Sequence, residues 1–324
     1  MRGGHMVIAA SAAESPLRHL ALFYRGRDDY LSAVRAFIRA GRARGDAVMV
    51  AVPARRARLL RRQLQDDAAY ASFVDMTNLG RNPARIIPAV RRFARGHRGR
   101  HFYCIGEPIW PDRTAEEVLE AVRHDALINL AFRDSLATIV CPYDHAELPR
   151  YVIADAARTH PAVISGGVEA VSDRYLGPGL PERYDRPLPA PPGRAEVLAY
   201  SGDLRPIRGF VARKARGAGL APGRADDLVL AVSELATNTL GHTAGGGVVR
   251  TWRTSGAVGA AGEIICQVED SGQITDPLAM HGAPSDGLPG GKGLWVVNQL
   301  CDLVQARTGP AGTTTRLHMS LPRP

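Results

Sequence analysis

The sequence lacks a phosphate-binding P-loop, a paired cysteine motif and any long apolar run. Its only cysteines are Cys104, Cys141, Cys266 and Cys301, and none lies in a Cys-x-x-Cys pair. Their spacing therefore predicts buried free thiols in a reducing compartment rather than a metal site or a disulfide framework. No segment approaches the ~20 apolar residues that cross a bilayer, and the N-terminus lacks the apolar core of a signal peptide. We therefore expect a cytoplasmic protein with no membrane partner.

The charge is strongly basic, with a formal net charge of +9 carried almost entirely by arginine. An arginine-rich surface can bind nucleic acid. Here the arginines are spread along predicted helices and mixed with acidic residues, and no helix-turn-helix pattern accompanies them. The charge therefore predicts a solvated surface, and we expect no nucleic-acid partner.

A proline-rich segment divides the chain into two predicted domains. Six prolines fall in residues 178–194, which excludes a helix or a central strand there. We expect this segment to be an extended, semi-rigid linker. The predicted domains on either side of it are residues 16–177 and 195–324, and the 45% of hydrophobic residues suffices for two globular cores.

The N-terminal domain alternates apolar segments with amphipathic ones. The pattern predicts strands at 18–24, 47–52, 71–75, 101–106 and 137–142. It predicts helices at 28–44, 53–65, 83–96, 114–133 and 145–159, with Thr114 and the acids that follow it at a helix start. This alternation predicts an α/β domain with a mostly parallel sheet and helices on both of its faces.

The C-terminal domain has its helices first and most of its strands later. Helices are predicted at 203–218, 224–241 and 292–301, and strands at 247–253, 263–270, 303–308 and 313–320. Residues 271–291 are predicted to form a loop rich in glycine and proline. The order is typical of an α+β two-layer sandwich with a hairpin-like sheet.

Three short motifs in this domain carry chemistry. Glu234 and Asn238 lie one helical turn apart, where an amide oxygen suits Mg²⁺ and a carboxylate can accept a proton. Asp270 and Gly272 end a strand, where a carboxylate can accept a hydrogen bond from adenine. Residues 290–293, Gly-Gly-Lys-Gly, precede a helix whose N-terminus can bind phosphate. Each motif alone also fits an ordinary surface helix, turn or loop.

In this order, the motifs resemble the boxes of the GHKL (Bergerat-fold) ATPases. Three segments resemble the corresponding segments of the anti-sigma-factor serine kinases: "LVLAVSELATNTLGHT", "CQVEDSG" and "GGKGLWVVNQLCDLV". The resemblance implies ATP and Mg²⁺ as cofactors, Glu234 as catalytic base and Asn238 as the Mg²⁺ ligand. It implies that the nucleotide is bound by Asn238, Asp270, Gly272, Gly291, Lys292, Gly293 and Thr314. The implied partners are an anti-sigma-factor antagonist of the STAS type, a sigma factor, or both, with the chain as a homodimer.

Two alternatives to a serine kinase remain open from the sequence. His124 superficially resembles the phosphoacceptor of a histidine kinase, but it lies on a single predicted helix inside the other domain, which indicates a structural role. The short loop at 273–290, rich in proline and glycine, can act as a lid over ATP or can restrict turnover. A non-catalytic module, in which ATP shapes a surface that sequesters a sigma factor or its antagonist, is therefore the second hypothesis.

The N-terminal domain places polar residues near predicted strand ends, where ligands bind in open parallel sheets. Over about residues 16–165, five segments resemble the MEDS sensory domain: "HLALFY", "GRNPARIIPA", "IGEPIWPDRTAEE", "HDALINLAF" and "CPYD". That resemblance implies a RecA/KaiC-like fold and a pocket for a small hydrocarbon-derived ligand. The candidate ligand contacts are His19, Tyr24, Glu107, Trp110, Arg113, Cys141, Tyr143 and Asp144. For His19 and Trp110 a packing role in the core is the alternative.

Overall fold

The structure is a computed structural model that describes residues 16–97, 99–255, 262–282 and 291–322. The chain divides into two compact units, Met1–Tyr184 and Asp185–Pro324, and the division falls inside the proline-rich segment. Each unit has its own hydrophobic core. In the described residues, no helix is long and apolar enough to cross a membrane. All four cysteines are buried and free, as their spacing predicted.

The first unit is built on one sheet with the strand order β3-β2-β4-β5-β1-β6-β7. All neighbouring pairs are parallel except β6 and β7, which form an antiparallel hairpin. The strands are β1 (Leu17–Tyr24), β2 (Ala47–Val52), β3 (Ser72–Asp75), β4 (Phe102–Gly106), β5 (Ala137–Asp144), β6 (Ala162–Ser165) and β7 (Val168–Val171). The predicted mostly parallel α/β sheet is confirmed, whereas the RecA/KaiC-like assignment within this class stays a prediction.

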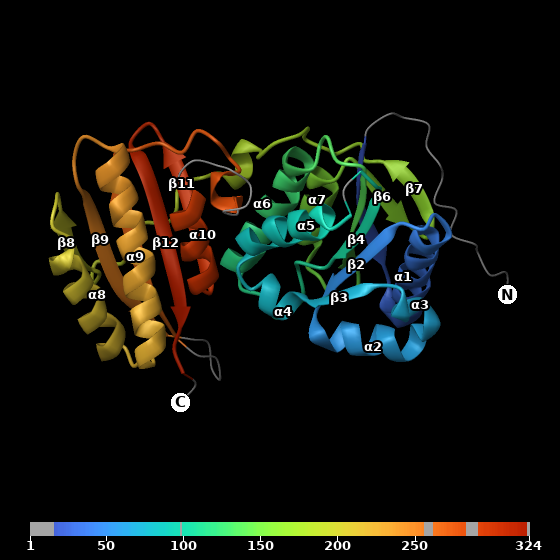
Figure 1. The fold of residues 1–324 in the computed structure, drawn as a ribbon, viewed down its shortest axis with the longest axis horizontal. Helices are drawn as coiled ribbons and strands as arrows, with labels where there is room; N and C mark the ends of the chain where they lie inside the picture. Colours follow the sequence, from blue (N-terminus) through green and yellow to red (C-terminus); the bar gives the residue numbers. More distant parts are fainter. Residues whose placement is uncertain (1–15, 98, 256–261, 283–290, 323–324) are drawn as a thin grey trace. The chain divides into compact units, whose positions relative to one another are not determined.

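Helices cover both faces of this sheet, as the alternating pattern predicted (Figure 1). The helices are α1 (Gly26–Ala43), α2 (Ala54–Leu64), α3 (Asp66–Ala69), α4 (Met76–Leu79), α5 (Ile86–Arg95), α6 (Ala115–Ala131) and α7 (Arg150–Thr159), with 3₁₀ turns at Pro83–Arg85 and Glu182–Tyr184. The core on one face joins α1 and α2 to the central strands, and α5 and α6 line the other face. A capping box of Thr114 and Glu117 starts α6, because each side chain accepts from the other's backbone N–H.

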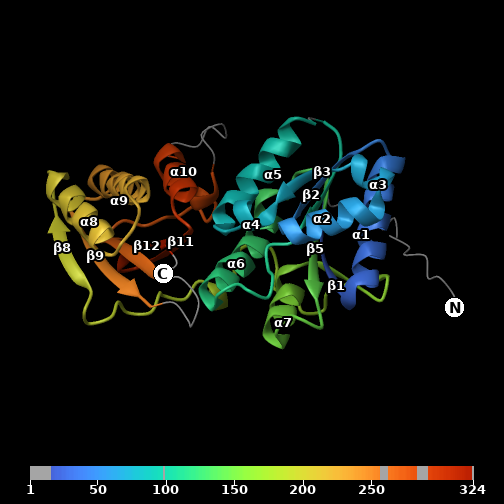
Figure 2. The same ribbon diagram turned by 90° about the horizontal axis from the view of Figure 1, so that it is seen from below.

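The second unit has an antiparallel sheet in the order β11-β12-β10-β9-β8. Its helices α8, α9 and α10 lie together on one side of that sheet (Figure 2). The elements are β8 (Glu196–Tyr200), α8 (Arg205–Gly217), α9 (Pro222–His242), β9 (Gly247–Thr254), β10 (Glu263–Asp270), a 3₁₀ turn at Ala279–His281, α10 (Gly291–Leu300), β11 (Leu303–Gly309) and β12 (Gly312–Ser320). The predicted two-layer α+β fold is confirmed.

Buried arginines hold the end of the proline-rich segment against this second unit. Arg316 donates to the carbonyl oxygen of Pro189 at 2.7 Å, and Arg307 donates to that of Arg186 at 3.1 Å. The backbone carbonyls of this proline-rich segment have no sheet partner, so the guanidinium groups satisfy them. Residues 185–189 therefore belong to the second unit rather than forming a free tether.

Candidate functional site

The predicted catalytic pair lies on α9, where it meets the first turn of α10. Leu228 and Leu235 bury one face of α9 in the core, which leaves Glu234 and Asn238 partly buried beside that face. A Cβ built on Gly293 would lie 2.8 Å from Glu234 Oε2 and 3.6 Å from Asn238 Nδ2. The structure thus brings together the acid, the amide and the glycine that the sequence singled out.

Both polar side chains of this pair are available to a ligand. Within the described residues, neither the Glu234 carboxylate nor the Asn238 amide forms a hydrogen bond. Partly buried polar groups normally find partners, so two adjacent groups without one indicate a place for a polar ligand. Carboxylate and amide oxygens are also common ligands of Mg²⁺, so the pair fits a magnesium ion bound to phosphate.

Asp270 is held in place at the other end of the site by hydrogen bonds to both of its oxygens. The Thr239 hydroxyl donates to Oδ2 at 2.8 Å, and the Gly272 backbone N–H donates to Oδ1 at 2.8 Å. Tyr200 in turn donates its hydroxyl to Thr239 Oγ1 at 2.9 Å. This chain fixes the plane of the carboxylate while each oxygen keeps a lone pair for a ligand.

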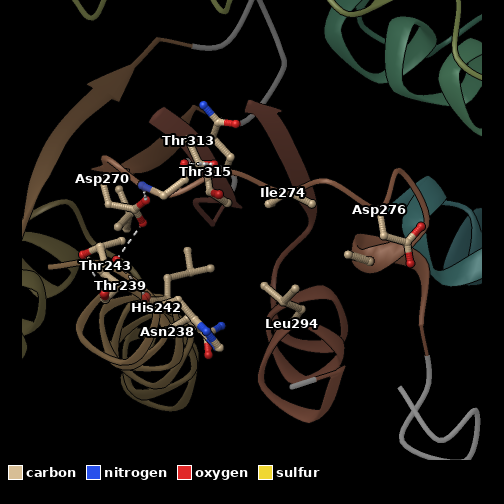
Figure 3. A pocket seen from close by; sticks show the side chains of 15 residues that line it. Asn238, Thr239, His242, Thr243, Asp270, Ile274, Asp276, Leu294, Thr313 and Thr315 are labelled. Atoms are coloured by element: carbon tan, nitrogen blue, oxygen red, sulfur yellow. Dashed lines mark hydrogen bonds between the residues drawn. The ribbon is translucent and has the colours of Figure 1, made fainter. Parts of the chain in front are cut away.

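A pocket of about 410 Å³ is lined by both Asn238 and Asp270, whereas Glu234 and Gly293 are not among its lining residues. Figure 3 shows Asn238 on α9, Leu294 on α10, and Asp270, Thr313 and Thr315 at the strand ends around it. The walls combine apolar side chains with a few polar groups, which is the usual lining of a ligand site of this size. Further lining residues include Leu235, Val268, Gly272, Ile274 and Ala279.

The threonine predicted to contact the nucleotide lies between two threonines that line the pocket. Thr313 and Thr315 line the pocket, but Thr314, between them on β12, does not. Side chains alternate between the two faces of a strand, so Thr314 faces away from the helices. Thr313 also donates its hydroxyl to the carbonyl oxygen of Gly272 at 2.8 Å, which ties β12 to the turn after Asp270.

The predicted phosphate-binding glycines form the start of α10. Gly291, Lys292 and Gly293 make up its first turn, and the Lys292 side chain is exposed. The backbone N–H groups of a first turn have no partner within the helix, so they suit an anion. Of the predicted lid, residues 273–282 are described and several of them line the pocket, whereas residues 283–290 lie outside the described residues.

In the first unit, some predicted sensory residues gather at the carboxyl ends of β1, β4 and β5. Arg56 of α2 connects them, because it donates to the Tyr24 hydroxyl at 2.9 Å and lies 3.7 Å from Glu107 and 3.6 Å from Asp144. Tyr30 donates its hydroxyl to Glu107 Oε2 at 3.1 Å. We call Tyr24, Tyr30, Arg56, Glu107 and Asp144 the strand-end cluster.

Burial controls the charge state of this cluster. Glu107 is 3% exposed, and burial raises the pKa of its carboxyl to about 7 against the lowering effect of Arg56. Burial also raises the pKa of Tyr24 and Tyr30 well above the ordinary value. A buried acid that titrates near neutrality at the carboxyl end of a parallel sheet is a typical functional-site feature.

Two comparisons with protein families decide what these units are. Residues 18–161 match the family described as MEDS, the methanogen/methylotroph, DcmR sensory domain. Residues 198–319 match the histidine kinase-like ATPase domain. The chain is a MEDS domain followed by a histidine kinase-like ATPase domain.

Comparisons with curated proteins and with solved structures do not narrow the assignment of the two domains. No curated protein matches the chain. Among solved structures, it is similar to an ATPase domain at 9% identity and a TM-score of 0.32, over 46% of this chain and 69% of that one. A likeness at that level supports no conclusion. The two matched domains together indicate a signalling regulator, and the histidine kinase-like ATPase domain implies ATP binding.

The remaining predicted sensory residues of the MEDS domain lie in two other places. His19, Cys141 and Tyr143 lie in the interior under α6 and α7, where His19 pairs with Asn129 and Tyr143 donates to Asp125. Arg113 stacks on Trp110, 4.4 Å from the ring centroid, and donates to the carbonyl oxygens of Pro108 and Arg81. The second pair ties loops together, which is a structural role.

Two features of the MEDS domain carry no signal in the sequence. Arg56, the centre of the strand-end cluster, belongs to an arginine-rich helix in which nothing distinguishes it from its neighbours. An open pocket of about 510 Å³ lies between α7 and the strands β1, β6 and β7, and none of the predicted sensory residues lines it. Its walls include Phe23, His145, Leu148, Ile153 and Val163.

Proposed function

We propose that this chain is a regulator in which a small-molecule-sensing MEDS domain controls an ATP-dependent protein-serine kinase of the anti-sigma-factor type. The observation that carries the proposal is the Glu234–Asn238 pair beside Gly293, because Asn238 of this pair lines a pocket that Asp270 lines as well. An acid and an amide without partners among the described residues suit a hydroxyl nucleophile and a phosphate-bound magnesium ion.

The pocket suggests how ATP would be oriented. The fixed Asp270 carboxylate has a lone pair on each oxygen for the exocyclic amino group of adenine. Apolar side chains such as Leu235, Val268 and Ile274 suit the faces of a base. The phosphates would then extend toward Asn238 and the first turn of α10, where backbone N–H groups favour anions.

Phosphotransfer at this site would need little covalent chemistry from the protein. The serine oxygen of the acceptor bonds to the γ-phosphorus, the bond to the bridging oxygen of ADP breaks, and Glu234 takes the hydroxyl proton. A magnesium ion held by Asn238 would neutralise charge on the phosphate oxygens.

The acceptor is proposed to be a separate protein. His124 is 1% exposed inside α6 of the first unit, so it is a poor phosphoacceptor. The resemblance of the motifs to the anti-sigma-factor serine kinases favours a STAS-type antagonist of an anti-sigma factor, a sigma factor, or both as partners. It also favours a homodimer of the chain. The MEDS domain supplies the input, for which the strand-end cluster is a candidate ligand contact.

A phosphotransfer assay tests the proposal. Labelled ATP, the chain and candidate antagonists are incubated, and the wild type is compared with Glu234→Gln. We expect serine phosphorylation of one antagonist and a loss of about 10²-fold or more in the variant, which keeps partner binding. Label on a histidine of the chain itself would contradict it. ATP-dependent binding of the antagonist without any phosphorylation would favour the non-catalytic module instead.

A further inference from the structure

A cluster of potential metal ligands lies buried in the MEDS domain, away from the strand-end cluster. His19 of β1, Cys141 of β5 and His160, which follows α7, are each no more than 2% exposed. His19 Nε2 lies 3.6 Å from Cys141 Sγ, and the imidazole rings of His19 and His160 are 4.0 Å apart between centroids. One ligand atom from each residue falls within 4.8 Å of the other two.

His160 presents a ring nitrogen that the protein leaves unused. Its Nδ1 lies 2.8 Å from the carbonyl oxygen of Ala156, which can only accept, so Nδ1 carries the proton and donates. With the proton of the imidazole on Nδ1, Nε2 keeps its lone pair. That Nε2 is buried without a hydrogen-bond partner among the described residues. Leaving such an atom unsatisfied costs about 1–3 kcal/mol, so a ligand is expected there.

His19 is held in the same tautomer. The Asn129 amide donates to the carbonyl oxygens of Thr159 and Ala126 at 2.8 and 3.2 Å, which directs its Oδ1 toward His19. His19 Nδ1 therefore donates to Asn129 Oδ1 at 3.0 Å, and Nε2 faces Cys141 with its lone pair. Histidines that bind metals almost always donate their other N–H to a carbonyl or carboxylate in this way.

We propose that His19 Nε2, His160 Nε2 and Cys141 Sγ bind a Zn²⁺ ion, with Asp125 as the fourth ligand. In a tetrahedral zinc site the sulfur and an imidazole nitrogen lie about 3.5 Å apart, close to the separation of Cys141 and His19. Asp125 Oδ1 lies 4.0 Å from Cys141 Sγ, while its Oδ2 accepts from Tyr143. Asp125 does not belong to the group of ligand atoms that lie within 4.8 Å of one another, so its carboxylate would have to move toward the ion to complete the coordination sphere.

The chemistry of the ligand set favours zinc. Two neutral imidazoles, one thiolate and one carboxylate suit a borderline-soft divalent ion. Binding breaks the S–H bond of Cys141, forms a bond between sulfur and zinc, and releases the proton to solvent. Four protein ligands leave no open position, so the ion would stabilise the MEDS domain rather than catalyse a reaction there. Since the ligands are buried, the metal enters as the chain folds.

Cobalt provides the test, because a thiolate bound to Co²⁺ gives a charge-transfer band in the near ultraviolet. The full chain is produced with Zn²⁺ or Co²⁺ in the growth medium, and its metal content is measured. We expect about one ion per chain and the thiolate band, both lost in Cys141→Ser and in His160→Gln. Cys104→Ser is the matched control, because Cys104 is equally buried on the neighbouring strand β4 and should leave both unchanged.

X-ray absorption at the zinc edge of the wild type keeps the proposal testable if a variant fails to fold. One sulfur and two imidazole nitrogens around the ion are expected. A wild type that is purified without metal from both media would overturn the proposal, as would a band that survives Cys141→Ser. A coordination shell with more than one sulfur would also overturn it. Because the cluster lies in the MEDS domain, none of these outcomes depends on the kinase proposal.

Discussion

In the proposed nucleotide site, one carboxylate, that of Asp270, would recognise adenine. Its orientation depends on Thr239, on the Gly272 N–H and, one step further away, on Tyr200. Glu269 precedes it on β10 but faces the other way, where it accepts from Arg250 at 2.9 Å. Neighbouring acids on one strand therefore have different roles, and a substitution can separate them.

Asp270→Asn should weaken the binding of an ATP analogue by about tenfold or more. A hydrogen bond to a charged group contributes about 1.5–3 kcal/mol, and ~1.4 kcal/mol corresponds to tenfold in affinity. Titration calorimetry measures the change. Glu269→Gln, the matched control, should bind like the wild type, and equal losses in both variants would exclude a specific role for Asp270.

Glu107 predicts a pH dependence of stability in the MEDS domain. Its pKa in the folded protein is about 7, against about 4.3 for a glutamate in an unfolded chain. The folded state holds this proton more tightly than the unfolded state does. The contribution of Glu107 to the free energy of unfolding is therefore complete below about pH 4 and is lost as the pH rises through 7. Relative to Glu107→Gln, the wild type should lose about 1–3 kcal/mol of unfolding free energy between about pH 5 and pH 8.

Urea unfolding of both proteins at several pH values measures this difference. The comparison cancels the contributions of the other buried titratable groups, because these are the same in both proteins. Parallel curves for wild type and variant would show that Glu107 titrates normally.

Single residues also show why the sequence located residues around the pocket of the second unit more readily than the strand-end cluster. Glu234, Asn238 and Asp270 belong to motifs with fixed spacing, so their positions could be read directly. Three consecutive threonines do not fix the phase of a strand, so the sequence could not tell that Thr313 and Thr315, rather than Thr314, line the pocket. Arg56 was missed, because its partners come from α1, β1, β4 and β5 and only the fold brings them together.

At the scale of elements, the contact between α9 and α10 sets the geometry around Glu234. Gly293 allows the close approach, because a Cβ there would meet Glu234 Oε2 at 2.8 Å. The clashing atom is the end of a flexible side chain, so the helices need not separate. An added methyl group should displace the carboxylate rather than unfold the domain.

Gly293→Ala should therefore lower phosphotransfer by about tenfold or more while it leaves the thermal midpoint nearly unchanged. Misplacing a catalytic group by about 1 Å can cost up to 10²-fold in rate. The matched control is Gly241→Ala, on α9, where a Cβ would meet no atom within 4 Å. A fall in the thermal midpoint without loss of activity would contradict this role of Gly293.

The elements that the sequence failed to predict are short or exposed. The β6–β7 hairpin turns through Gly166 and Gly167, both with positive φ, and two such glycines between apolar segments are a usable hairpin signal. β7 exposes Val168 and Val171, so its burial pattern carries no strand signal. Strand β10 was predicted with its observed ends, because its apolar residues continue up to a clear turn at Asp270.

At the scale of the whole molecule, two separate cores predict separate unfolding. The division at Tyr184 and Asp185 leaves each unit with its own sheet and its own buried cluster. In scanning calorimetry of the full chain, Mg-ATP should raise the transition of the ATPase domain and leave that of the MEDS domain in place. Asp270→Asn should abolish the shift. A single transition that moves as a whole would mean that the units unfold together.

The assignment of the pocket to Mg-ATP is tested most directly by a calorimetric titration of the full chain with a non-hydrolysable ATP analogue, with and without Mg²⁺. Magnesium-dependent binding is expected, and Asn238→Ala should weaken it by at least about tenfold. Thr237→Ala, an exposed neighbour on α9, should bind like the wild type. No binding by the wild type, or an unchanged affinity in Asn238→Ala, would contradict this assignment.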